Sequence, residues 1–285
     1  MFHDNMVFIL MDINRLITGS RSMKVSGTDK TDTEFTAHAM KCIEELFVMC
    51  PGKILMNAGF CLDEYMTEQK YVKLFRKLLS EFRKKYDVPV ISITPSAAVL
   101  GRMRHIFRLQ GNLALLKIPD EIRLGLILDG QIVSDTKAWA KKIAHFPVSP
   151  GGVKCSCGHK GCANCYITHP ATMNRYRELS GKDCGGIHKF RLLLDEKDPV
   201  CMKIACENGE ILGKALVPLA SELSLSLIYL YNVDPVTFEA AVESFKKHSK
   251  KRKTVIEQCW YLRTDVCAGV IEMCIANIKD LKHAC

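Results

Sequence analysis

The sequence lacks any run of about 18 uninterrupted apolar residues, the length that a helix needs to cross a bilayer. It also lacks internal repeats and low-complexity segments. Its opening, MFHDNMVFILMDIN, has acidic residues on both sides of a very short apolar core, which is unlike a signal peptide. We therefore expect no membrane span and a cytoplasmic protein.

The cysteine pattern of a small disulfide scaffold is missing as well, although the chain has 14 cysteines. They are spread through 285 residues and have apolar neighbours, as in KCIEELFVMC and EMCIAN. This pattern is typical of reduced thiols that pack as small hydrophobes in a cytosolic protein. Hydrophobic residues make up 48% of the chain, enough for a sizeable core, and the length favours two domains or one large α/β unit.

The formal net charge is +9, but most lysines and arginines lie at helical spacing among acids, as in KLFRKLLSEFRKKY. Such spacing indicates a solvated helix face. One dense basic run is interpreted as a solvated loop, with a binding patch as the alternative. This run contains Lys246, Lys247, Lys250, Lys251, Arg252 and Lys253.

Strands and helices alternate along the first half of the chain, which predicts an α/β architecture. Apolar runs predict strands near 6–13, 54–58, 88–93, 113–118 and 123–133. Helical periodicity predicts helices over 34–49, 68–86, 96–107, 198–231 and 262–282. Either Thr94 or Ser96 is expected to cap the third helix, and VDPVTFEAAVE is expected to introduce a strand.

A Gly-, Cys- and Lys-rich segment without periodicity contains a candidate zinc site. His145 lies ten residues before Cys155, Cys157 follows two residues on, and Cys162 five further. Four such donors can converge on one tetrahedral ion, and the glycines among them let the loop wrap around it. Cys165 and His159 are alternative donors, and a loop of unliganded thiols is the competing interpretation. A closed set of four protein ligands predicts a structural rather than a hydrolytic zinc.

These residues resemble the zinc motif of the ROK family, which groups bacterial sugar kinases with sugar-responsive repressors. The family pattern is His, about ten residues, then Cys-x-Cys-Gly-x-x-Gly-Cys-x-Glu, and CSCGHKGCAN follows His145 at that spacing. LILDGQIV, AKKIAH, SAAVLG and NVDPVTF resemble further family segments more weakly. The resemblance implies a two-lobed, actin-like (ribonuclease-H-like) ATPase fold with a sugar cleft between the lobes. We expect one lobe over 1–105, joined by 262–285, and a second over 106–261 with the zinc loop at 145–165.

Several positions depart from the family pattern. The family's catalytic Asp stands where this chain has Thr94, and a threonine hydroxyl holds its proton too tightly to act as that base. Two family glutamates that accept sugar hydroxyls become Lys142 and Asn164. We therefore expect the chain to have no catalytic residues.

Phosphate-binding glycines are also missing at three places. The family's Asp-Ile-Gly-Gly-Thr-Lys loop reads DINRL from Asp12, and any Cβ there would block the approach of backbone N–H groups to phosphates. We match a second glycine-rich turn to 134–142 and a third to AAVESF at 240–245, neither of which contains glycine.

The sequence thus predicts a catalytically inactive ROK-like protein, a sugar-sensing, regulatory or scaffold module with a small sugar ligand. We expect a homo-oligomer and no direct DNA-binding domain, because the strand at 6–13 begins where the family's repressors carry a winged helix-turn-helix. The alternative is a divergent sugar kinase that uses ATP and Mg²⁺, with Asp12, Asp129 or Asp135 as its carboxylate. A third hypothesis is an interaction protein in which the cleft is closed core.

Overall fold

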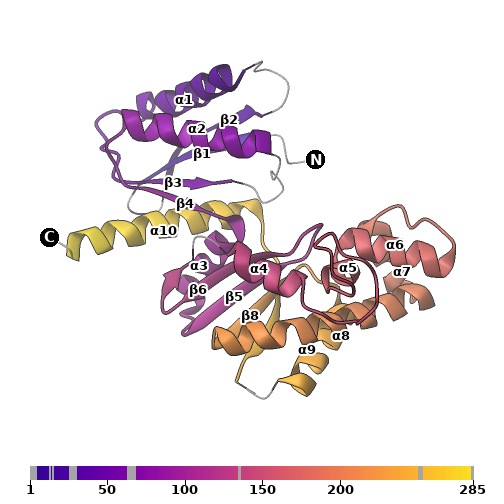
Figure 1. The fold of residues 1–285 in the computed structure, drawn as a ribbon. Helices are drawn as coiled ribbons and strands as arrows, with labels where there is room; N and C mark the ends of the chain where they lie inside the picture. The colour runs from indigo at the N-terminus through magenta and orange to yellow at the C-terminus, as the bar shows by residue number, and fades with distance from the viewer. Residues whose placement is uncertain are drawn as a thin grey trace. The chain divides into compact units, whose positions relative to one another are not determined.

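The computed structural model describes residues 5–12, 14, 16–25, 31–62, 69–133, 136–249 and 253–283. The chain divides into two compact units, one made of Met1–Arg102 with Arg263–Cys285 and the other of Met103–Leu262. Both units combine strands with helices (Figure 1). Among the described helices, none is both long enough and apolar enough to cross a membrane.

The first unit contains an antiparallel pair of strands, β1 with β2, and a parallel pair, β3 with β4. Its elements are β1 (Asn5–Met11), β2 (Ile17–Lys24), α1 (Asp32–Val48), β3 (Ala58–Cys61), α2 (Gln69–Lys85), β4 (Val90–Ile93), the first part of α3 (Pro95–Phe107) and α10 (Arg263–His283). Helix α1 begins with a capping box, in which the side chain of Thr31 accepts from the backbone of Glu34 and the Glu34 carboxylate accepts from the backbone of Thr31.

The C-terminal helix α10 packs closely against the other elements of the first unit. A Cβ on Gly59 of β3 would overlap the side chain of Val270, and a Cβ on Gly269 would overlap the backbone of Ala98 in α3. The Asn57 side chain also donates to the Cys274 carbonyl over 3.1 Å. Residues far apart in sequence therefore complete one core.

The second unit is built on a five-stranded sheet in the order β7-β6-β5-β8-β9. Strands β5, β8 and β9 run parallel, and β6 and β7 are antiparallel to their neighbours. Its elements are β5 (Asn112–Lys117), β6 (Arg123–Leu128), β7 (Gln131–Ile132), α4 (Lys137–Ala144), α5 (Asn164–Ile167), α6 (His169–Ser180), α7 (Ile187–Asp195), α8 (Pro199–Glu222), β8 (Leu225–Tyr231), α9 (Pro235–His248) and β9 (Val255–Cys259).

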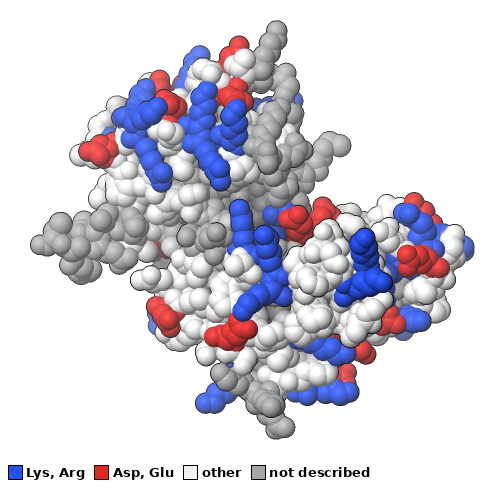
Figure 2. All heavy atoms as spheres, viewed as in Figure 1, with Lys and Arg blue, Asp and Glu red and all other residues white. Residues whose placement is uncertain are grey.

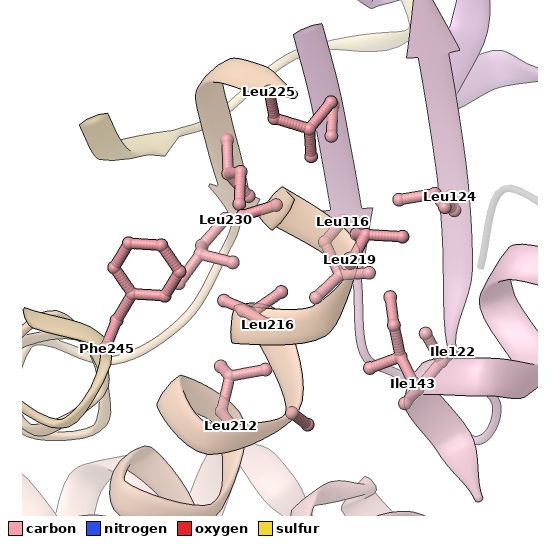
Figure 3. Close-up of a cluster of buried hydrophobic side chains, with 14 of the residues drawn as sticks. Leu116, Ile122, Leu124, Ile143, Leu212, Leu216, Leu219, Leu225, Leu230 and Phe245 are labelled. Atoms are coloured by element: carbon pink, nitrogen blue, oxygen red, sulfur yellow. The ribbon is translucent and has the colours of Figure 1, made fainter. Parts of the chain in front are cut away.

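Helix α8 supplies much of the core of this unit (Figure 3). Leu212, Leu216 and Leu219 of α8 are buried together with leucines of β5 and β8 and with Phe245 of α9. Gly209 and Gly213 of α8 face α9 so closely that a Cβ at either position would overlap the α9 backbone. The absence of side chains at these two positions lets the two helices pack backbone to backbone.

Most of the predicted elements are confirmed, but two segments of the second unit were predicted wrongly. The expected helix over 198–231 ends at Glu222, Ser224 adopts a left-handed φ of 48°, and the apolar residues that follow form β8. The expected strand after Asp234 is helix α9, because the Asp234 side chain accepts from the Thr237 N–H as an N-cap and Pro235 begins the helix.

Three strands also differ from the expectation. Strand β3 begins only at Ala58, where 54–58 was predicted, while β2 and β9 were not predicted at all. Both missed strands contain many polar residues, as the sequences ITGSRSMK of β2 and VIEQC of β9 show. Each pairs with a more apolar strand, β2 with β1 and β9 with β8. Their strand conformation therefore depends on tertiary pairing.

Candidate metal centre and the predicted catalytic positions

The four predicted metal ligands lie at the junction of three local structures. His145 is the C-cap residue of α4, Cys155 and Cys157 lie on a tight hairpin, and Cys162 lies one residue before Ala163, the N-cap of α5. The Cys155 N–H donates to the His159 carbonyl over 2.8 Å, and the Gly158 N–H donates back to Cys155 over 3.0 Å. These bonds fold the hairpin so that both of its cysteines face the same side.

The donor atoms of His145, Cys155, Cys157 and Cys162 all lie within 4.8 Å of one another. The Sγ atoms of Cys157 and Cys162 are 3.7 Å apart, and the Sγ atom of Cys155 is 3.5 Å from Nδ1 of His145. A tetrahedral zinc ion with ordinary Zn–S and Zn–N bonds has ligand–ligand edges of about 3.8 and about 3.6 Å. The donor set and both distances therefore fit zinc.

Burial and hydrogen bonding set different proton affinities for the thiols. Burial raises the pKa of the Cys155 thiol, but bonds from the Cys157 backbone and from neighbouring side chains lower it by more, to about 6. Burial, together with hydrogen bonds to the other two cysteines, raises the pKa of the Cys162 thiol to about 12. A bound cation needs thiolates, so metal binding would release protons, and its affinity would fall as the pH falls.

The two alternative donors lie beside the cluster and outside it. The Sγ atom of Cys165 is 3.9 Å from the Lys154 carbonyl, and burial raises the pKa of its thiol to about 11. His159 is exposed, with Nδ1 3.5 Å from Cys157 Sγ. Neither residue belongs to the set of four mutually close donors.

Gly161 holds the two sides of the loop together. Its N–H donates to the Val153 carbonyl, and its own carbonyl accepts from the N–H of Val148, each over 2.8 Å. Its φ is +73°, and a Cβ there would overlap the carbonyl of Ser149. Only glycine satisfies both conditions at this position.

We expect Gly161→Ala to lower the free energy of unfolding by about 2–4 kcal/mol and to reduce metal content, because backbone strain and steric overlap add. Thermal unfolding and metal analysis measure both effects. Gly151→Ala is the matched control, since Gly151 has a φ of +77° but open space around its Cβ position. Equal losses in the two variants would show that strain alone acts, and that the overlap with Ser149 costs nothing.

Thr94, the residue that we match to the family's catalytic Asp, caps helix α3. Its Oγ1 accepts from the Ala97 N–H over 3.3 Å, and its carbonyl accepts from the Ala98 N–H over 2.9 Å. Of the two expected caps, the helix therefore uses Thr94 rather than Ser96. The hydroxyl has a structural role as an N-cap acceptor.

The two replaced glutamate positions have different surroundings. Lys142 is exposed on α4, where its Nζ lies 2.5 Å from the Glu222 carboxylate and 4.8 Å from the centre of the Trp139 ring. Asn164, at the start of α5, has a buried Oδ1 with no hydrogen-bond partner among the described residues. Leaving a buried acceptor unpaired costs about 1–3 kcal/mol, so this atom is a candidate for a bond to a ligand.

The segments matched to phosphate-binding turns require a correction. Residues 137–142 lie in α4 and 240–245 in α9, so these residues are helical where turns were expected. The first loop does form a turn: Asp12 Oδ1 accepts from the N–H groups of Asn14 and Leu16, each over 2.9 Å, where β1 leads into β2. Ile13 and Arg15 of this loop lie outside the described residues.

The structure gives little support for the other two candidate catalytic carboxylates, Asp129 and Asp135. Asp129 adopts a φ of 47° in the tight turn between β6 and β7, with Gly130 at 84°, and its N–H donates to the Asn112 side chain over 2.8 Å. This geometry is that of a type I′ hairpin turn. Asp135 lies outside the described residues, as do three members of the basic run, Lys250, Lys251 and Arg252.

Comparison with known proteins identifies relatives of part of the chain. The model of the ROK family matches residues 121–254. Over 112 residues the chain is 26% identical to the xylose repressor of Bacillus subtilis (strain 168), covering 37% of this chain and 29% of the repressor. Over 72 residues it is 36% identical to the kanosamine kinase of Amycolatopsis mediterranei (strain S699), covering 25% of this chain and 24% of the kinase. The chain matches less than a third of the length of either relative.

Solved structures resemble the chain over nearly its whole length. A ROK hexokinase from Thermus thermophilus superposes with a TM-score of 0.70 at 15% identity, covering 98% of this chain and 97% of that chain. A ROK family transcriptional regulator, a homologue of the E. coli MLC protein, gives a TM-score of 0.74 at 15% identity, covering 97% and 77%. These similarities confirm the predicted actin-like ATPase fold. The sequence similarity to the ROK family thus covers residues 121–254, and the similarity of fold extends over nearly the whole chain.

Proposed function

We propose that this protein is a catalytically inactive member of the ROK family that binds a small sugar and acts as a sensing, regulatory or scaffold module. The observation that carries the proposal is the cap on α3. The group at the family's catalytic position is a hydroxyl, and it accepts a hydrogen bond from the backbone of Ala97. A threonine hydroxyl cannot take a proton from a sugar near neutral pH.

The carboxylates that could replace a base have structural roles. Asp12 accepts two backbone N–H bonds within its own turn, and Asp129 occupies a left-handed position in a hairpin turn. Moving the Asp12 side chain toward a substrate would break both of its bonds, and the backbone of Asp129 is held by a bond from its N–H to the Asn112 side chain. Both observations support an inactive protein over the alternative, a divergent sugar kinase that uses ATP and Mg²⁺.

The proposed zinc has a structural role. His145, Cys155, Cys157 and Cys162 would hold it, and the ion would cross-link a segment that is rich in glycine and exposed polar residues. Four protein donors leave no open position for a reacting water. Reduced thiols are required for such a site, so we place the protein in the cytoplasm, and we also expect a homo-oligomer.

The proposed sugar ligand would use Asn164. Its buried Oδ1 can accept a hydroxyl hydrogen, and Asn164 lies two residues after the ligand Cys162. The zinc site would therefore fix the position of this acceptor. The names of the two curated relatives, a xylose repressor and a kanosamine kinase, both refer to sugars.

Titration calorimetry against glucose, N-acetylglucosamine, N-acetylmannosamine, fructose, xylose and allose, with and without ATP, tests the proposal. We expect at least one sugar to bind, and Asn164→Ala to weaken it by about tenfold, the loss of one hydrogen bond to a buried acceptor. Asn174→Ala, at an exposed position of α6, is the control and should leave the affinity unchanged. Binding that is insensitive to Asn164→Ala would remove this residue from the site, and no heat with any sugar would remove the sensing role.

A further inference from the structure

One face of helix α2 carries five cations. Lys73, Arg76, Lys77, Arg83 and Lys84 fall within about 120° of the helix circumference, at 100° per residue. The opposite face contributes Leu74, Leu78 and Phe82 to the core of the first unit. Core packing therefore fixes the orientation of the helix and keeps the five cations, hereafter the α2 basic face, turned toward solvent.

The lysines and arginines of this face differ in their partners. Lys73 forms an ion pair with Asp32 over 3.0 Å, Lys77 donates to the Thr33 hydroxyl over 2.8 Å, and Lys84 pairs with Glu81 over 2.8 Å. Arg76 and Arg83 are exposed and form no ion pair or hydrogen bond with the residues that the structure describes. Figure 2 shows basic side chains gathered over this part of the first unit, with acidic side chains interspersed among them.

The sequence pattern predicts a solvated helix face, and most of the described basic residues of α2 are exposed as expected, but the acids balance them only in part. Helix α2 has one acidic residue, Glu81, and α1 supplies Asp32 and Glu44 along one flank only. Exposed ion pairs of this kind are weak, roughly 0–1 kcal/mol, so the lysines can exchange their partners for a stronger anion. Arg76 and Arg83 can bind an anion without giving up an ion-pair partner, because their paired N–H donors are already available.

The composition of the face indicates which polyanion it suits. Ser80 lies at its centre, and among the described residues of α2 no large apolar side chain is exposed. A protein interface needs a buried apolar or aromatic centre, and a membrane-bound helix needs apolar groups to insert. A phosphate backbone needs neither, because cations and hydrogen-bond donors supply its affinity.

We propose that the α2 basic face binds the phosphate backbone of a nucleic acid without reading its sequence. The five cations extend over about 17 Å of helix, a length comparable to a few nucleotides of one strand. Arg76 and Arg83 would each bind one phosphate through paired N–H donors, and the lysines would add contacts that need no fixed geometry. This proposal is independent of the sugar ligand and of the zinc.

Fluorescence anisotropy with a labelled 20-base-pair DNA duplex and with a labelled single-stranded RNA tests it. We expect binding that weakens by about 10²-fold between 50 and 200 mM salt, as release of counterions from four or five phosphates requires. Arg76→Glu/Arg83→Glu should lower the affinity at least tenfold and reduce the slope of log K against log salt by about 2. Arg76→Lys/Arg83→Lys should retain most of the binding, which separates lost charge from lost folding.

Arg177→Glu/Lys203→Glu is the control of equal charge change, at two exposed cations of α6 and α8 in the second unit. We expect this variant to bind almost as the parent does. No binding to either nucleic acid, or equal losses in the two charge-reversed variants, would overturn the proposal. So would stronger binding to polyglutamate or to phosphatidylserine vesicles than to nucleic acid of matched charge.

Discussion

Cys162→Ser is expected to purify with little or no zinc and to unfold about 10 °C below the parent protein. Cys162 is 2% exposed, and its sulfur is 3.7 Å from that of Cys157, so the serine would remove a buried thiolate from a closed set. Structural zinc contributes its binding free energy to folding. A loss of about 3–4 kcal/mol lowers the unfolding temperature of a chain of this size by about 10 °C. Metal analysis and differential scanning calorimetry on chelator-free protein measure both effects.

Cys165→Ser is the sharpest control for the zinc prediction, because Cys165 is the nearby thiol outside the set of four donors. It should retain one zinc per chain and nearly the parental stability. Cys206→Ser, at an exposed cysteine of α8, controls for the general effect of losing a thiol. Zinc retained in Cys162→Ser but lost in Cys165→Ser would mean that Cys165 is a ligand. Parent protein without zinc would end the metal proposal.

Sugar-dependent ATP turnover is expected to be absent. Phosphoryl transfer needs a base at the attacking hydroxyl and close backbone contacts to the phosphates. Thr94 caps a helix, and in the first loop the N–H groups of Asn14 and Leu16 are bonded to the Asp12 carboxylate. Loss of a catalytic base alone costs about 10²–10⁴ in rate. A coupled ADP-release assay over the six sugars, with Mg²⁺, provides the measurement.

Thr94→Asp gives the most informative variant for this assay. Aspartate is an N-cap as good as threonine, so the variant should fold normally, whereas Thr94→Ala should lose about 1 kcal/mol of stability. We expect no turnover from Thr94→Asp, because the N–H groups of Asn14 and Leu16 in the first loop are already bonded to the Asp12 carboxylate. Turnover near one per second in the parent protein would contradict inactivity and direct attention to Asp12 and Asp129. Turnover in Thr94→Asp alone would show that the phosphate site is intact.

The metal cluster was predictable because all four donors come from one short segment and its glycines allow a tight loop. Sequence spacing could not reveal that Cys165 lies outside the cluster although it is only three residues from Cys162. Nor could it reveal the unpaired Oδ1 of Asn164, since burial of one atom depends on packing from several elements. The only sequence signal at this position was the replacement of a family glutamate by Asn164. From that replacement we predicted the loss of a sugar-hydroxyl acceptor, and we did not predict a new one.

The errors in the fold have a common physical origin. Residues 225–231 follow a long helix as an apolar run without Gly or Pro, so periodicity alone cannot separate helix from strand there. Asp234-Pro235 suits both the entry to a strand and the N-terminus of a helix, and the aligned family segment favoured the wrong one. Tertiary pairing makes residues 225–231 a strand, because β8 lies between β5 and β9 and pairs with both of them. The connection from β8 to the parallel strand β9 then contains helix α9, which begins at Pro235.

The order of segments along the chain also affects how the protein is made. Helix α10 belongs to the first unit, where it packs closely against Gly59 and against the backbone of Ala98, yet it is synthesised after the whole second unit. Translation proceeds at about 5–20 residues per second, so the whole second unit leaves the ribosome before the first can be completed. During that interval β3 and α3 expose the surfaces that α10 later covers. The segment Met1–Arg102 therefore completes its core only after α10 has been made, although this segment is synthesised first.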